Sequence, residues 1–274
     1  MTRMDLNDAR VLVTGASAGL GRELAVVLAG RGARLALVAR REAALRDLAD
    51  ELRGRGLHAP LVLAADLTQA GVPATVGAAA LGGLGGLDVL INNAGTHFVD
   101  ALARVADGPP ARDVFEIHLW APLALTSAVL PSMLTQGHGT VVNVTAGMAS
   151  LPAPFVGYYA ASKSALAQVT RSLRHELRHT PIRVLEFCPG PNDTAGRNQG
   201  YGAVPWKTKP RSLRAASPRK TAEVAVRALE RGSRRVTYPR IARLPGEVPA
   251  IGSLLTALAA RAIDTSGSVD TGRQ

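Results

Sequence analysis

Short apolar segments recur along this chain at a regular spacing, and segments with helical periodicity separate them. The apolar segments are residues 10–15, 34–39, 60–64, 87–91, 140–144 and 182–187, the first of which reads RVLVTG. Runs of this length, rich in Val, Leu and Ile, are typical of buried strands. Strands that alternate with helices favour a parallel sheet covered by helices on both faces. We therefore expect an α/β fold built on a doubly wound parallel sheet.

The pattern continues without a break in composition, so we expect a single domain over residues 1–263. Helical periodicity is clearest over residues 111–135 and 157–178. Residues 192–218 are weakly periodic and rich in glycine, proline and basic side chains, which is typical of a lid or of a disordered loop. The small polar residues of the tail, 264–274, predict disorder there.

Composition excludes several kinds of protein. Cys188 is the single cysteine, so neither an internal disulfide nor a cysteine-based zinc site can form, and we expect no metal and a cytoplasmic location. The N-terminus lacks the apolar run of a signal peptide, and no stretch approaches the roughly 20 apolar residues of a membrane-spanning helix. The net charge of +11 raises the question of nucleic acid, but no basic face interleaved with aromatic residues is visible. We assign the charge to an anionic cofactor and a solvated surface, and expect neither a nucleic-acid partner nor an integral membrane segment.

A glycine-rich turn, TGASAGLG at residues 14–21, lies between the first strand and the first helix. Glycines at this place allow a tight turn and let backbone N–H groups approach a diphosphate at the helix N-terminus. An ordinary strand-to-helix turn is the simpler alternative, but the position within a repeating strand–helix pattern favours dinucleotide binding. The candidate binding residues in this turn are Gly15, Ser17, Gly19, Leu20 and Gly21.

Together with three later motifs, this turn resembles the classical short-chain dehydrogenase/reductase family over about residues 8–235. The later motifs are Asn-Asn-Ala-Gly at 92–95, Tyr159-x-x-x-Lys163, and Pro189-Gly190 followed by Thr194, each placed after a predicted strand. The resemblance implies a Rossmann-type fold and a nicotinamide dinucleotide cofactor. In the family, the residues that match Asp66, Asn93 and Gly95 contact the adenosine half of the cofactor. The loop that matches Pro189, Gly190 and Thr194 holds the nicotinamide amide.

The end of the second predicted strand bears on which cofactor is bound. In the family, an acidic residue there holds the ribose hydroxyls of NAD, whereas arginine neutralises the extra phosphate of NADP. Here the strand ends at Ala39 and is followed by Arg40 and Arg41. A guanidinium donates paired, charge-assisted hydrogen bonds to phosphate. We therefore expect NADP(H), with two solvated arginines as the alternative.

Tyr159 and Lys163 carry the expected chemistry and, by resemblance, also contact the cofactor. Residues four apart on a helix share one face. A nearby ammonium favours tyrosinate, so we expect the pKa of Tyr159 to lie below the usual value of about 10. Tyrosine could then donate a proton to a carbonyl oxygen as hydride arrives, or remove a proton from an alcohol.

Two other catalytic positions depart from the family pattern. Ala146 stands where the family has a serine that binds the substrate oxygen, and Thr145 could replace it only if a bulge turned its side chain to that face. His118 aligns with an asparagine that supports a proton-relay water. It could hold such a water, or it could be a structural histidine bonded to the backbone.

These observations leave three hypotheses for function. The first is NADPH-dependent reduction of a carbonyl, or oxidation of the alcohol, in a small-molecule metabolite. The second is a non-redox step such as elimination, epimerisation or cyclisation, and the third is an NADP-binding protein without catalysis. The complete turn and the Tyr/Lys pair favour the first.

The resemblance also implies a homodimer or homotetramer formed through the helices at 111–135 and 157–178. These helices carry more apolar residues than one sheet-facing stripe needs. The residues in question are Leu123, Leu125, Val129, Leu166 and Val169.

Overall fold

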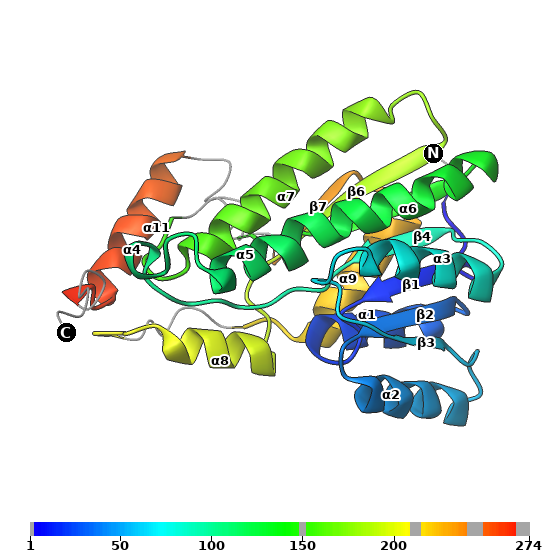
Figure 1. Ribbon diagram of the computed structural model, residues 1–274, viewed down its shortest axis with the longest axis horizontal. Coiled ribbons are helices and arrows are strands. Elements are labelled where there is room, and N and C mark those ends of the chain that lie inside the picture. The colour runs from blue at the N-terminus through cyan, green and yellow to red at the C-terminus, as the bar shows by residue number, and fades with distance from the viewer. Residues whose placement is uncertain (1–2, 148–151, 209–214, 240–248, 267–274) are drawn as a thin grey trace.

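The structure is a computed structural model that describes residues 3–147, 152–208, 215–239 and 249–266. Within these residues, seven parallel strands form one sheet in the order β3-β2-β1-β4-β5-β6-β7 (Figure 1). The strands are β1 Arg10–Thr14, β2 Arg34–Ala39, β3 Leu61–Ala64, β4 Val89–Asn92, β5 Gly139–Val144, β6 Ile182–Pro189 and β7 Arg235–Tyr238. The predicted doubly wound sheet in a single domain is confirmed.

Helices cover both faces of the sheet, as the alternating sequence pattern predicts. On one face, α1 (Gly19–Ala29), α2 (Glu42–Gly54) and α9 (Pro218–Glu230) share a core with strand residues such as Val13 and Leu37. On the other face, α3 (Val72–Leu84) and α6 (Ala121–Thr135) pack on neighbouring strand residues such as Leu12 and Val38. Successive strand residues point to opposite faces, so each strand contributes to both cores. Cys188 is buried at the end of β6, as expected for a core residue.

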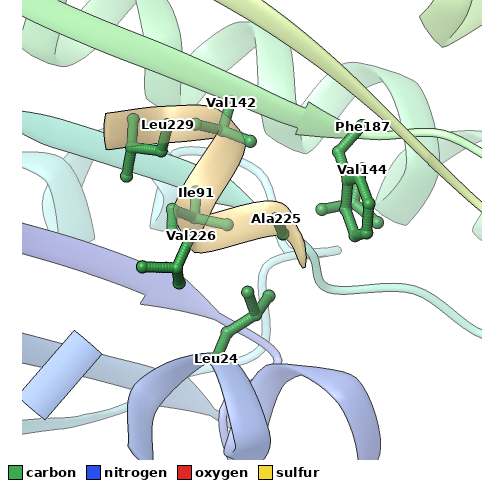
Figure 2. A pocket seen from close by; sticks show the side chains of 8 residues that line it. All are labelled: Leu24, Ile91, Val142, Val144, Phe187, Ala225, Val226 and Leu229. Carbon is green, nitrogen blue, oxygen red and sulfur yellow. The ribbon is translucent and has the colours of Figure 1, made fainter. Parts of the chain in front are cut away.

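A small apolar void lies between the sheet and helices α1 and α9 (Figure 2). Figure 2 shows Leu24 of α1 facing Val226 of α9 across the void, with Ile91 and Val142 contributed by the strands. Its volume is about 10 Å³ and its lining is almost entirely apolar. Such a void offers a water molecule no polar partners and is too small for a metabolite, so it is a packing defect of the core.

The helix predicted at 111–135 is interrupted by one turn of π-helix. It consists of α5 (Pro109–Phe115), the π-helical η1 (Glu116–Trp120) and α6. Pro122 has no N–H to donate to the carbonyl of His118, four residues earlier, which removes one bond of the regular ladder. Single π-helical turns of this kind recur at functional sites, and this one contains His118.

Other elements differ from the expectation. The segment 192–218 is not irregular throughout, because it contains α8 (Ala195–Ala203). Helix α3 continues to Leu84 and is followed by Gly85, whose φ of 73° suits glycine. The sequence pattern also missed β7 and α11 (Pro249–Ala262). Of the tail predicted to be disordered, only residues 264–266 fall within the described residues, and residues 267–274 lie outside them.

One helical stretch among the described residues, Pro109–Thr135, is long and apolar enough to cross a membrane by length and composition. Its most apolar window has a mean hydropathy of 1.4 and is 44% buried inside the protein, against α3 and the sheet. This is weak evidence for a membrane span, since a core helix passes the same test.

Candidate active site

The predicted site residues gather where the carboxyl ends of β1 and β4 meet, which is the point where the strand order reverses. Thr14, the last residue of β1, joins the two strands. Its hydroxyl accepts hydrogen bonds from the backbone N–H groups of Asn93 and Ala94, both at 2.9 Å, and donates to the carbonyl of Ile91 at 3.3 Å. The side-chain amide of Asn93 donates to the carbonyl of Thr14 at 2.9 Å. The side chain of Asn93 therefore positions the two strand ends, while its backbone lies beside the glycine-rich turn.

The glycine-rich turn adopts a backbone that other residues would strain. Gly15 and Gly19 have φ values of 69° and 55°, in the left-handed region. A Cβ at Gly21 would lie 2.2 Å from the carbonyl oxygen of Gly15, and a Cβ at Gly15 would lie 2.8 Å from the Cα of Ala94. Ala18, the N-cap residue of α1, has no side chain that could cap the first N–H groups of the helix. This cradle fits a diphosphate.

Two arginines follow β2, and one of them contacts the glycine-rich turn. The guanidinium of Arg41 donates to both the carbonyl and the hydroxyl of Ser17, each at 3.2 Å. Arg40 lies near Asp66, whose carboxylate accepts hydrogen bonds from the backbone and hydroxyl of Thr68. Partial burial opposes ionisation, but these bonds and Arg40 keep the pKa of Asp66 below its usual value. Arg41 therefore contacts the turn, and Arg40 lies near the carboxylate of Asp66.

The segment after β6 returns to the same turn. The side chain of Thr194 lies over Gly19, where a Cβ would meet its methyl carbon at 3.1 Å. Pro189 ends β6, and the N–H of Gly190 donates to the carbonyl of Tyr238 at 2.7 Å. The remaining predicted turn residue, Leu20, packs against the core below.

Tyr159 and Lys163 lie in the first two turns of α7 (Gly157–Glu176). Lys163 is 5% exposed and donates to the carbonyl of Val144, at the end of β5, at 2.9 Å. Burial lowers the pKa of Lys163 to about 8 and raises the pKa of Tyr159 to about 12. The expected lowering of the tyrosine pKa was therefore wrong, because removing the phenol from water outweighs the attraction of the lysine.

His118 connects the backbone after β4 with α7. The N–H of Thr96 donates to Nε2 at 3.0 Å, so Nδ1 carries the ring proton and faces the hydroxyl of Ser162 at 2.8 Å. That hydroxyl donates onward to the carbonyl of Tyr159 at 2.9 Å. Burial, reinforced by the charge of Lys163, lowers the pKa of His118 well below 6.5. Both ring nitrogens have protein partners, which favours the structural alternative, although the partners differ from the predicted backbone carbonyl.

Thr145 does not join Tyr159 and Lys163. Its hydroxyl donates to the carbonyl of Phe187 and to the sulfur of Cys188, both at 3.2 Å on β6. β5 ends at Val144 without the bulge that would turn Thr145 toward the site. Ala146 follows and has no hydroxyl, so neither residue supplies a hydroxyl to Tyr159.

Sequence reasoning missed His97, which is exposed in the segment after β4. Its ring stacks on Tyr159 with centroids 5.2 Å apart and planes 12° apart. His118 approaches the same tyrosine edge-on, with centroids 5.5 Å apart. His97 lies only two residues after the Asn-Asn-Ala-Gly motif, and this short distance in sequence was the one feature that could have placed it near the site.

A larger cavity lies beyond His97, beneath α8. Its volume is about 390 Å³, and it is lined by Val99, Arg104, Phe155, Ala203, Pro205, Asp264 and Ser266. The carboxyl end of the lid segment closes one wall, since Trp206 forms a bridge with Ile263 and the N–H of Asp264 donates to the carbonyl of Pro205 at 2.7 Å. The C-terminal segment therefore packs against residues 205–206.

The buried lysine predicts an unusual dependence of stability on pH. In the folded chain the pKa of Lys163 is about 8, whereas the usual value for lysine is about 10.4. Between these two pH values the unfolded chain binds more protons than the folded chain. The free energy of unfolding therefore rises with pH in this range. We expect the free energy of unfolding of the wild type, relative to Lys163→Met, to rise by roughly 2–3 kcal/mol from pH 7 to pH 10. Denaturant unfolding at several pH values measures this difference in free energy. Lys220→Met, at an exposed lysine, is the control, and we expect no such pH-dependent difference between it and the wild type. A difference independent of pH would contradict the assignment.

Comparison with known proteins gives one consistent result. The sequence model of the short chain dehydrogenase family matches residues 9–201. Dehydrogenase/reductase SDR family member 7B from Mus musculus is 36% identical over 231 residues, covering 80% of this chain and 69% of that protein. The match to its Rattus norvegicus counterpart, at 38% identity, covers 68% of this chain and 58% of the relative.

Solved structures show the same likeness. A short-chain dehydrogenase from Streptomyces avermitilis superposes with a TM-score of 0.76 at 31% identity, covering 91% of this chain and 96% of that chain. An alcohol dehydrogenase from Thermococcus sibiricus, complexed with 5-hydroxy-NADP, superposes with a TM-score of 0.72 at 26% identity, covering 83% of this chain and 94% of that chain. With its parallel sheet, its glycine-rich turn and its Tyr/Lys helix, the chain belongs to the short-chain dehydrogenase/reductase family.

Proposed function

We propose that this protein is an NADPH-dependent oxidoreductase that reduces the carbonyl of a small-molecule metabolite. The observation that carries the proposal is the placement of Tyr159 and Lys163 on one face of α7, at the strand ends that also form the glycine-rich cradle. The names of the similar proteins, which are dehydrogenases and reductases, support the same class of reaction.

The residues present fit a nicotinamide dinucleotide. The N–H groups at the start of α1 would hold the diphosphate, Asp66 and Gly95 the adenosine half, and the loop from Pro189 to Thr194 the nicotinamide end. Gly95 suits this place, because a Cβ there would lie 2.7 Å from Nε2 of His118. The bound cofactor supplies the hydride. The 5-hydroxy-NADP in the similar alcohol dehydrogenase supports an NADP-type ligand here.

The protonation state of Tyr159 fits the role of proton donor. With a pKa raised to about 12, the hydroxyl keeps its proton at neutral pH and can donate it to a carbonyl oxygen as hydride reaches the carbon. The tyrosinate left behind gains the attraction of Lys163, which is mostly charged below its pKa of about 8.

The adjacent tyrosines provide a matched test of the proton donor. Tyr159→Phe should lower kcat for NADPH-dependent reduction at least 100-fold, as expected for loss of general acid catalysis. Tyr158→Phe should leave kcat nearly unchanged, because the hydroxyl of Tyr158 donates to the carbonyls of Leu102 and Ala106, outside the site. The assay follows NADPH absorbance with a panel of ketones and aldehydes. Full activity of Tyr159→Phe would overturn the proton-transfer role and favour a non-redox step, and NADPH binding without any turnover would favour a non-catalytic protein.

The preference for NADP(H) is tested at Arg41, the arginine that contacts the turn. Arg41→Ala should weaken NADPH binding by roughly 1.5–3 kcal/mol, the range for hydrogen bonds to charged groups, and should leave NADH binding almost unchanged. Arg46→Ala is the matched control, since Arg46 pairs with Glu42 on the same helix and away from the turn. Calorimetric dissociation constants for both cofactors measure the effect. Equal loss for NADPH and NADH would contradict a phosphate contact.

A homodimer or homotetramer remains part of the proposal. Of the five apolar residues that suggested it, Leu123 and Val169 are half-buried and the other three are not at the surface. Leu125, Val129 and Leu166 are buried within a single chain and do not argue for a partner. Trp120 and Leu134, on the η1–α6 helix, are 54% and 40% exposed and provide apolar surface for a second copy. We expect a mass of two or four chains by light scattering at micromolar concentration, and a monomer mass would overturn this expectation.

A further inference from the structure

The cavity of about 390 Å³ beneath α8 begins close to Tyr159. The ring of His97 stacks on Tyr159 with the centroids 5.2 Å apart, and Val99, two residues later in the chain, lines the cavity. Two residues of extended chain span at most about 7 Å. The volume falls within the range of about 300–1,000 Å³ that is typical of small-molecule pockets. The cavity is therefore within reach of the body of a substrate whose carbonyl meets Tyr159.

Phe155 forms a buried wall of this cavity in a backbone conformation that phenylalanine rarely adopts. It lies four residues before Tyr159, is 9% exposed and has a φ of 65°, in the left-handed region. The carbonyl of Phe155 accepts a hydrogen bond from the N–H of Asp100 at 2.8 Å. Its side chain belongs to a small buried apolar cluster with Ala101, Val204 and Ile263. Residues held in such a conformation by their surroundings are frequent at binding and active sites.

The lining of the cavity becomes more polar toward its mouth. Phe155 is buried at the inner end, whereas the side chains of Arg104, on α4 (Leu102–Val105), and Asp264 are 53% and 46% exposed. The guanidinium of Arg104 donates to the carboxylate of Asp100 at 2.8 Å, and the carboxylate of Asp264 accepts from the backbone N–H two residues later at 3.1 Å. Both charged groups therefore have partners within the protein, so the cavity does not require a charged substrate.

We propose that Phe155 determines substrate specificity, and that the substrate is a ketone or aldehyde with an apolar ring system beside its carbonyl. The inference rests on the proposed reductase function. With the carbonyl oxygen at the hydroxyl of Tyr159, the ring system lies in the cavity against the side chain of Phe155, where contacts between aromatic rings are favourable. Polar groups at the far end of the substrate reach water at the mouth. A small aliphatic ketone leaves the cavity unfilled and binds weakly.

Two ketones of different size test this role, with NADPH as the reductant and with product formation followed by chromatography. The carbonyl of 2-butanone can meet Tyr159 without filling the cavity, whereas 2-acetylnaphthalene places its naphthyl group there. For the wild type, kcat/KM should be at least about 10-fold higher for 2-acetylnaphthalene, as expected for contacts in an apolar pocket. Phe155→Ala should lower this kcat/KM about 10- to 100-fold, mainly through KM, and should change that for 2-butanone less than about 3-fold. Ala203→Phe, which fills the cavity from α8, should act in the same direction.

A second substitution at the same position separates loss of the ring from damage to the fold. Glycine adopts a left-handed φ without strain, so Phe155→Gly should have a higher Tm than Phe155→Ala and the same loss with 2-acetylnaphthalene. Phe98→Leu is the matched control, because Phe98 contacts Tyr158 and is not among the described residues that line the cavity. It should leave kcat/KM for both ketones unchanged.

An unchanged ratio of the two kcat/KM values in Phe155→Ala and Phe155→Gly would overturn the inference while leaving the reductase function intact. An equal loss with both ketones would also overturn it, since general damage to the site would explain that result. If the wild type reduces neither ketone, the proposed function fails, and calorimetric binding of 2-acetylnaphthalene in the presence of NADPH then tests the pocket by itself. Binding that Phe155→Ala weakens at least about 10-fold supports the pocket, and the absence of binding overturns it.

Discussion

The hydrogen bonds around Thr14 are the constraint on which the site depends. One hydroxyl at the end of β1 fixes the backbone that follows β4, through the N–H groups of Asn93 and Ala94. The side-chain amide of Asn93 donates a hydrogen bond to the carbonyl of Thr14 on β1. Gly15 packs so closely against Ala94 that a Cβ would not fit. The cradle for the diphosphate and the segment carrying Gly95 and His97 are therefore built as one unit. A shift in either strand would displace both.

This unit reaches α7 through His118. From Ala94 the backbone leads to Thr96, whose N–H donates to His118, and His118 faces Ser162, which donates to the carbonyl of Tyr159. Because the backbone N–H fixes Nε2 as an acceptor, the ring stays neutral and adds no positive charge beside Lys163. His118 thus connects the segment after β4 with the tyrosine helix through direct protein partners.

Features that depend on local sequence could be predicted, whereas features that depend on tertiary packing could not. The buried strands, the glycine-rich turn and the spacing of Tyr159 and Lys163 follow from periodicity and from helix geometry, so they could be predicted. α8 could not, because its sequence AGRNQGYGA has poor helix propensity, and it packs on His97 across almost a hundred residues of sequence. The raised pKa of Tyr159 depends on burial, which the spacing of two residues does not reveal. The π-helical turn could be predicted only in part. Pro122 shows that one backbone hydrogen bond of the helix must be absent, but it does not show that the helix responds with a π-helical turn.

Burial of Lys163 carries a cost in stability. Burial lowers the pKa of the lysine from 10.5 to about 8, which corresponds to roughly 3 kcal/mol against the charged form. An apolar residue of similar size would remove that penalty, and a folded protein has only about 5–15 kcal/mol of net stability. Its hydrogen bond to the carbonyl of Val144 recovers only part of this amount. A buried charge beside a desolvated tyrosine is therefore costly as structure alone, whereas it is expected where a tyrosinate must form and be stabilised.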